Sequence, residues 1–214
     1  ETFCALDHAS LIWEQGHSIA IMGESGSGKS TLARLMIGLE RPSEGRVLIN
    51  GVDTTKWGLR EWRKYRGKIQ AVFQDAGGTL NPSWSTSKNV EEALVNLTDL
   101  SPSQRKNRIA ELMEQTGLSK SLLDTPVRKL SGGEQRRLAL LRSLSISPEF
   151  LILDEVTAGL DLISTEAVLQ LLEKYEQEHD CAYLVITHDL QVASRLCEVI
   201  YEIEHGKFTK KAVR

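Results

Sequence analysis

The chain has 214 residues, 41% of them hydrophobic and 26% charged, with a formal net charge of -3. This length is enough for one compact domain with a real core and short for two. The charge balance lacks the basic excess typical of proteins that bind nucleic acid, so no nucleic-acid partner is expected.

The three cysteines have no CxxC spacing, which argues against a disulfide framework or a structural zinc site and favours a reducing cytosol. No apolar run approaches the ~18 residues that span a bilayer, so we expect contact with a membrane to pass through another protein.

Short apolar runs rich in β-branched residues predict strands along the chain. They lie at 18–23, 45–51, 68–74, 150–155 and 182–188. Most are nearly continuous rather than alternating, which is typical of strands buried on both faces of a mainly parallel sheet flanked by helices. The stretch 199–214 predicts a short hairpin that turns at His205 and Gly206. The sequence therefore predicts an α/β fold.

A helical insertion is predicted between Gln74 and the apolar run at 150. The stretch 101–118 opens with Ser-Pro and places Ile109, Leu112 and Met113 on one face. The predicted helix stops at Gly117, as helices commonly do at glycine.

The motif GESGSGKST follows the first predicted strand and runs into the helical pattern LARLMIGL. It matches the phosphate-binding pattern G-x-x-x-x-G-K-[ST] in the strand-loop-helix context that the pattern requires. Gly26 and Gly28 let successive N–H groups point inward at phosphate oxygens, and the helix adds the positive end of its dipole. Lys29 would reach the β and γ phosphates, and the Ser30 hydroxyl would ligate Mg²⁺. The predicted nucleotide-binding residues are Gly23, Glu24, Ser25, Gly26, Ser27, Gly28, Lys29, Ser30 and Thr31. The alternative is a flexible Gly/Ser turn with a solvated lysine.

The run FLILDE predicts a buried strand that delivers Asp154 and Glu155 to the carboxyl edge of the sheet, where α/β proteins bind ligands. Asp154 fits a Mg²⁺ ligand acting through a coordinated water. Glu155 fits a general base for the water that attacks the γ-phosphate. The alternative is a helix N-cap followed by a first-turn acid.

A second anion site is predicted at Ser131, Gly132 and Gly133, which precede the helical run EQRRLALLRSL. A nucleotide already bound by the first loop does not require this second anion site in the same subunit. The simplest hypothesis is that this turn closes over the nucleotide of a second subunit packed head to tail. The alternative is a capped helix with Ser131 as its N-cap and no ligand.

The motifs GESGSGKST, LSGGE, LILDE, AGLD and ITHD, with a glutamine after a strand, follow the order and spacing of ATP-binding cassette (ABC) ATPases. The chain resembles that family over nearly its whole length. The resemblance implies a single domain: an α/β P-loop NTPase (RecA-like) core at about 1–80 and 146–214 with a mainly parallel sheet. It also implies an N-terminal antiparallel β part and an inserted helical subdomain at about 81–145.

Further roles are implied by this resemblance, with ATP and Mg²⁺ as cofactors. Gln74 resembles the Q-loop residue, which senses the γ-phosphate and Mg²⁺ and hinges the helical lobe. Asp161 resembles the D-loop aspartate at the dimer seam. His188 resembles the switch histidine, which contacts the γ-phosphate and steadies the attacking water.

A narrower resemblance to the peptide and nickel importers of this family rests on Glu24 and on LNP shortly after Gln74. Such ATPases are peripheral subunits at the cytoplasmic face of the cell membrane, working as homo- or heterodimers beneath transmembrane permeases. An extracytoplasmic solute-binding protein delivers peptide, nickel or a metal chelate. The stretch 75–97, including Trp84, would lie near the groove that receives the permease, although a loop aromatic packed on its own lobe is the alternative.

Two departures from the family pattern keep other hypotheses open. Val156 stands where most cassette ATPases have proline, which predicts altered loop rigidity, and only Phe3 is a candidate for stacking on adenine. The alternatives are a non-transport ABC module of the DNA-repair or translation type, or a weakly active regulatory subunit of a heterodimeric pair.

Overall fold

The computed structural model describes residues 4–75 and 77–213, so Phe3 lies outside the described residues. The chain divides into two compact units. The first comprises Glu1–Ala71, Glu149–Glu155 and Ala182–Arg214, and the second comprises Val72–Pro148 and Val156–Cys181. The single domain with the boundaries given above stays a prediction.

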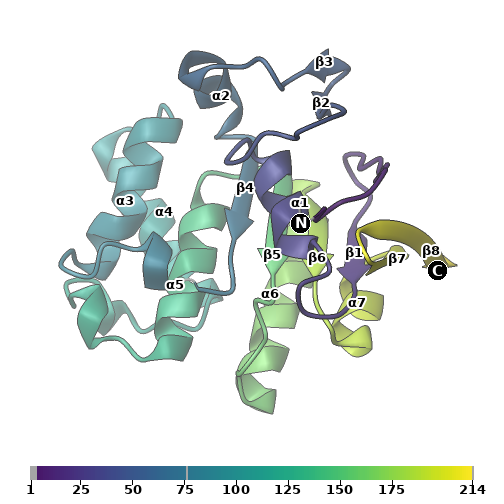
Figure 1. The fold of residues 1–214 in the computed structure, drawn as a ribbon. Helices are drawn as coiled ribbons and strands as arrows, with labels where there is room; N and C mark the ends of the chain where they lie inside the picture. The colour runs from purple at the N-terminus through teal and green to yellow at the C-terminus, as the bar shows by residue number, and fades with distance from the viewer. Residues whose placement is uncertain (1–3, 76, 214) are drawn as a thin grey trace. The chain divides into compact units, whose positions relative to one another are not determined.

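A six-stranded sheet with the strand order β4-β5-β6-β1-β7-β8 belongs to the first unit (Figure 1). Its strands are β1 (Ile19–Met22), β4 (Ile69–Val72), β5 (Phe150–Asp154), β6 (Ala182–Ile186), β7 (Val199–Glu204) and β8 (Lys207–Val213). β1 pairs in parallel with β6 and β7, and β5 pairs in parallel with β6. β8 pairs with β7 as the predicted antiparallel hairpin. The mainly parallel sheet is confirmed.

The central strands of this sheet are buried on both faces. Every residue of β6 is buried, as are all those of β5 after Phe150. Their register aligns the carboxyl ends of three strands, because Ile186 pairs with Ile21 of β1 and with Asp154 of β5. The loops that follow β1, β5 and β6 therefore leave the same edge of the sheet.

A separate two-stranded antiparallel sheet is formed by β2 (Leu48–Ile49) and β3 (Val52–Asp53). Of the predicted strand at 45–51, only β2 is extended, and it pairs with β3 rather than joining the main sheet. The helices of the first unit are α1 (Lys29–Met36), α2 (Leu59–Tyr65) and α7 (Leu190–Leu196). α1 packs against β5, and α7 packs against β1 and β6.

The second unit is helical, and its helices between Gln74 and Phe150 are those predicted for the insertion, whereas α6 lies in the range predicted for the core. It contains α3 (Thr86–Leu97), α4 (Pro102–Gln115), α5 (Gly132–Ser145) and α6 (Leu162–His179), with 3-10 turns at Gly77–Thr79, Lys120–Leu122 and Val127–Lys129. The helices α3, α4 and α5 pack on one another (Figure 1). α4 begins with a capping box of Ser101 and Gln104 and buries Ile109, Leu112 and Met113, which confirms the predicted helix.

The chain contains no described helix that combines the length and the apolar character needed to cross a membrane.

Candidate functional site

The loop between β1 and α1 has the backbone that the phosphate-binding motif requires. Gly28 is the N-cap of α1 at φ 103°, and no side chain of the described residues caps this helix. A Cβ at Gly28 would lie 2.2 Å from the carbonyl oxygen of Ala5, so only glycine fits there. An uncapped helix start beside a glycine loop leaves N–H groups for an external anion.

Lys29 is held inside this loop. Its Nζ donates to the carbonyl oxygens of Gly23 at 2.8 Å and Glu24 at 2.6 Å, and to the Ser27 Oγ at 3.3 Å. Burial lowers the pKa of the Lys29 ammonium. The loop thus keeps a positive charge at the place where the sequence predicts phosphate.

Ser30 and Asp154 meet although 124 residues separate them, because α1 starts beside the end of β5. The Ser30 Oγ donates to Asp154 Oδ2 at 3.1 Å. Asp154 is only 5% exposed, and burial raises the pKa of its carboxyl. A buried carboxylate beside a hydroxyl is an oxygen pair that suits Mg²⁺.

The side chains around this pair bear on the metal prediction. Within residues 4–75 and 77–213, no group of three or more His, Cys, Asp or Glu side chains is placed to hold a metal ion. Mg²⁺ at nucleotide sites is usually bound through one or two protein ligands together with phosphate oxygens and water. The Ser30–Asp154 pair fits that partial ligand set.

Glu155 and His188 form a second pair at the same edge of the sheet. The His188 Nδ1 lies 2.9 Å from Glu155 Oε1, and this hydrogen bond raises the pKa of His188. The Glu155 backbone is left-handed at φ 52°, and its side chain is 13% exposed. Its Oε2 is buried and has no hydrogen-bond partner among the described residues. That oxygen has an acceptor position left for a water molecule.

The predicted second anion site lies at the start of α5 in the second unit. Ser131 is the N-cap, and its Oγ accepts a hydrogen bond from the Glu134 N–H at 3.3 Å. Glu134 Oε2 in turn accepts from the Ser131 N–H and Oγ, both at 2.8 Å, and these two bonds lower the pKa of Glu134. A carboxylate of the chain itself thus occupies the serine donors. The sequence pattern S-x-x-E signals this capping box, but Glu134 was not among the predicted site residues.

Asp161 and Gln74 also belong to the second unit. Asp161 is the exposed N-cap of α6, where its carboxylate accepts from the Ser164 N–H at 2.8 Å and the Ser164 Oγ at 2.9 Å. Gln74 is exposed and follows the end of β4 by two residues. Their roles toward nucleotide stay predictions.

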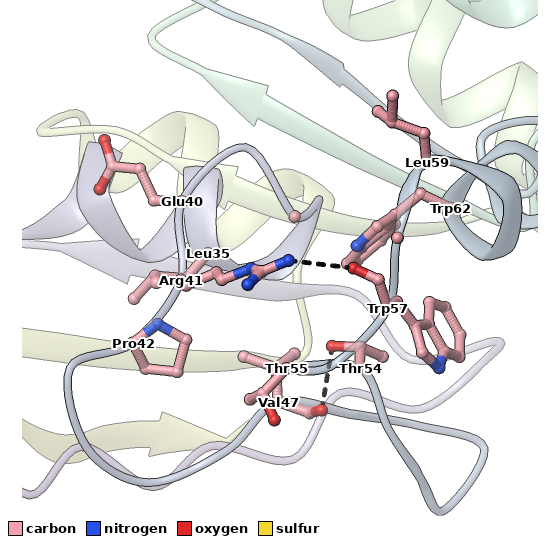
Figure 2. Close-up of a pocket in the computed structure, with 12 residues that line it drawn as sticks. Leu35, Glu40, Arg41, Pro42, Val47, Thr54, Thr55, Trp57, Leu59 and Trp62 are labelled. Atoms are coloured by element: carbon pink, nitrogen blue, oxygen red, sulfur yellow. Dashed lines mark hydrogen bonds between the residues drawn. The ribbon is translucent and has the colours of Figure 1, made fainter.

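A pocket of about 230 Å³ lies in another part of the first unit (Figure 2). It is lined by Leu35, Gly38, Glu40, Arg41, Pro42, Val47, Thr54, Thr55, Trp57, Gly58, Leu59 and Trp62. None of these is a predicted site residue, so the pocket is separate from the phosphate loop.

Comparison with known proteins shows the family of the chain. The family described as ABC transporter matches residues 6–158. A nickel import ATP-binding protein (NikE) from Rhodospirillum rubrum is 36% identical over 207 residues, covering 97% of this chain and 75% of that protein. The nickel import ATP-binding protein of Escherichia coli K12 is 36% identical over 208 residues, covering 97% of this chain and 78% of the other.

Solved structures give the same result. The dimeric ATP-binding cassette MJ0796 in a post-hydrolysis state with ADP and Pi has a TM-score of 0.91 at 33% identity, covering 98% of this chain and 91% of the other. cbiO1 from Clostridium perfringens, part of the ABC transporter complex cbiONQ, has a TM-score of 0.84 at 30% identity, covering 98% of this chain and 82% of the other.

The chain belongs to the ABC transporter family. It has the cassette fold and is an ATP-binding and ATP-hydrolysing protein that resembles the importer branch, as the motifs predicted.

Proposed function

We propose that the chain powers import of a small solute, such as nickel, a peptide or a metal chelate, by hydrolysing ATP beneath partner permeases. The observation that carries the proposal is the meeting of Ser30 with Asp154 and of Glu155 with His188 at one sheet edge. The direction of transport and the choice of solute rest on the nickel import relatives.

The phosphate loop binds and orients the nucleotide in this proposal. Lys29 exchanges its contacts with the loop carbonyls for β and γ phosphate oxygens, while the N–H groups at the start of α1 receive the remaining charge. Ser30 and Asp154 would hold Mg²⁺, which would neutralise charge on the phosphates when bound.

Glu155 acts as the general base. Its unpartnered Oε2 accepts a proton from the attacking water as the water's oxygen bonds to the γ-phosphorus; the bond from that phosphorus to the bridging oxygen breaks, and ADP leaves. His188 holds the other carboxylate oxygen and so fixes the orientation of the base. Gln74 contributes by contacting the γ-phosphate and Mg²⁺.

A second cassette completes the site by presenting Ser131, Gly132 and Gly133 to the nucleotide of its partner. The dimeric cassette with ADP and Pi supports this arrangement. Leu162 and Ile163 follow Asp161 directly and are 88% and 84% exposed, as expected for residues that a dimer seam would cover.

Transmembrane permeases bind next to the helical unit, and an extracytoplasmic solute-binding protein delivers the cargo. The stretch 75–97 is the proposed permease contact. Within it, Trp84 is half-buried, and the Lys88 Nζ lies 4.7 Å from the centroid of its ring. The chain would then be a peripheral protein at the cytoplasmic face of the cell membrane.

Light scattering of the Glu155→Gln variant with and without Mg-ATP tests the dimer. A mass that doubles only with Mg-ATP is expected, and Ser131→Arg should abolish the doubling by blocking the second anion site. A variant that binds ATP and stays monomeric would contradict the homodimer and direct the search to a different cassette as partner.

Turnover of the isolated wild-type chain tests the other functions. Intact ATP affinity with turnover near zero would favour the regulatory subunit, although the Glu155–His188 pair speaks against it. Stimulation of hydrolysis by nucleic acid would favour the non-transport module. Identifying the permeases that co-purify with the chain would reduce the number of candidate solutes.

A further inference from the structure

The helix α2 is fixed to the first unit by aromatic packing on one face. Trp62 is buried, and its indole lies against Gly38, where a Cβ would come within 2.1 Å of the ring. Trp57 contacts Trp62 edge-on at 5.2 Å between ring centroids and Tyr65 at 4.5 Å. This cluster anchors α2 and leaves its opposite face to solvent.

The exposed face of α2 carries Leu59, Arg60, Arg63 and Lys64. At 3.6 residues per turn these side chains lie within an arc of about 140°. Leu59 is 83% exposed, and although it is one of the residues that line the pocket, Figure 2 shows its side chain directed away from Arg41. This basic face therefore combines cations with an exposed apolar side chain.

The cations of the basic face are not neutralised within the described chain. Arg60, Arg63 and Lys64 are exposed, and they take no part in the ion pairs formed by the described residues of this unit. The one acid of α2, Glu61, is engaged at the helix start, where its Oε2 accepts from the Gly58 N–H at 2.9 Å.

The charge of this segment is opposite to that of the chain. Residues 56–68 contain six cationic side chains and one acidic side chain, a formal charge of +5 in a chain of net charge -3, so the remainder carries -8. Arg63 and Lys64 in the last turn also complement the helix dipole. That role does not account for Arg60 at the start of the helix or for the exposed Leu59.

We propose that the basic face of α2 binds the anionic headgroups of membrane phospholipids, with Leu59 reaching the interface. Clustered Lys and Arg attract anionic lipid, and an exposed apolar side chain beside them adds burial at the headgroup level. The proposal rests on the proposed function, which places the chain at the membrane. It revises the expectation that membrane contact passes only through another protein, because a surface contact needs no spanning segment.

The basic face and the nucleotide site lie at opposite edges of the sheet. α2 leads into the amino end of β4, and the Phe150 N–H donates to the Lys68 carbonyl at 2.9 Å, so β4 and β5 start side by side. The phosphate loop, Glu155 and His188 follow the carboxyl ends of their strands. Substitutions on the basic face therefore leave ATP hydrolysis unchanged.

Vesicle flotation of the purified chain tests the proposal, with phosphatidylcholine vesicles that do or do not contain phosphatidylglycerol. The triple variant Arg60→Gln, Arg63→Gln, Lys64→Gln keeps helix propensity and removes the cations. The matched control Lys106→Gln, Lys120→Gln, Lys174→Gln changes the net charge equally in the second unit. Wild type and control should bind only the anionic vesicles, and the triple variant should bind them about a hundredfold more weakly.

Leu59→Ala supplies a second, milder variant. It should weaken binding roughly fivefold, since it shortens the apolar side chain at the interface. Absence of wild-type binding to anionic vesicles, or an equal loss in the control, would overturn the proposal. Retention of the wild type on immobilised polyglutamate without vesicle binding would also overturn it and assign the face to an acidic protein.

ATP hydrolysis measured on the same samples separates the two proposals. Normal ATP hydrolysis in a chain that does not bind the vesicles refutes the lipid-binding proposal and leaves the proposed function intact. Selective vesicle binding in a chain that does not hydrolyse ATP supports the lipid face and refutes the proposal that this chain powers import.

Discussion

Two helices of this protein begin at glycine-containing turns that the sequence predicts to bind anions, and the two turns differ in how their backbone N–H groups are capped. α1 begins at Gly28 with no side-chain cap and no acid in its first turn. α5 begins at Ser131 with a complete capping box that brings the Glu134 carboxylate onto the serine donors. The first turn is open to a phosphate, and the second is satisfied by its own chain.

The difference shows how one motif type can serve two purposes. An uncapped start surrounding Lys29 is suited to hold a nucleotide before any partner arrives. A self-capped start is stable without ligand, so a phosphate bound there as proposed would have to compete with Glu134 for Ser131. This contrast fits a site that forms only when two cassettes close.

The largest expected effect comes from Glu155→Gln. Loss of the base should reduce steady-state ATP hydrolysis about 10²-fold or more while ATP binding persists. Phosphate release and fluorescent ATP titration measure the two quantities. Unchanged hydrolysis would refute the base assignment, and Glu44→Gln, an exposed substitution, serves as the control.

Lys29→Ala should weaken ATP binding about 10- to 100-fold, since a charged hydrogen-bonding partner of the phosphates is lost from the open turn. Equilibrium titration measures the effect, with the exposed Lys106→Ala as control. Equal affinity in variant and wild type would show that the ammonium does not face the phosphates.

Glu134→Gln tests whether the carboxylate at the start of α5 hinders the binding of a partner's nucleotide there. Glutamine also completes a capping box, so α5 should keep its start while losing a negative charge beside Ser131. ATP-driven dimerisation in the Glu155→Gln background should tighten about two- to fivefold, the range for one exposed charge interaction. Weaker dimerisation would mean that the carboxylate helps the partner nucleotide to bind.

The smallest expected effect belongs to Asp161→Asn. Hydrogen bonds from Ser164 lower the pKa of Asp161, so this carboxylate stabilises the fold above the ordinary Asp pKa and loses that effect as the pH falls through its lowered pKa. Asparagine caps helices about as well and does not titrate. Melting temperatures should match at neutral pH, and the variant should lose slightly less stability in acid. Identical acid profiles would show that the cap carries no pH dependence.

Much of the fold was readable from local pattern. The continuous apolar runs predicted buried parallel strands, because both faces of β5 and β6 are covered. Ser101, the apolar spacing and Gly117 marked α4. The run at 45–51 did not reveal that β2 would pair with β3 in a separate sheet of the described residues, since strand partners are not encoded in a short apolar stretch.

The sequence by itself determined the two glycine-containing helix starts at Gly28 and Ser131, because glycine placement and helix starts depend on neighbouring residues. Only the tertiary structure decided which side chains meet across the site. Ser30 reaches Asp154 over 124 residues, and Glu155 reaches His188, because the register of β1, β5 and β6 aligns their carboxyl ends. Backbone pairing between distant strands fixes that alignment, and no local pattern specifies it.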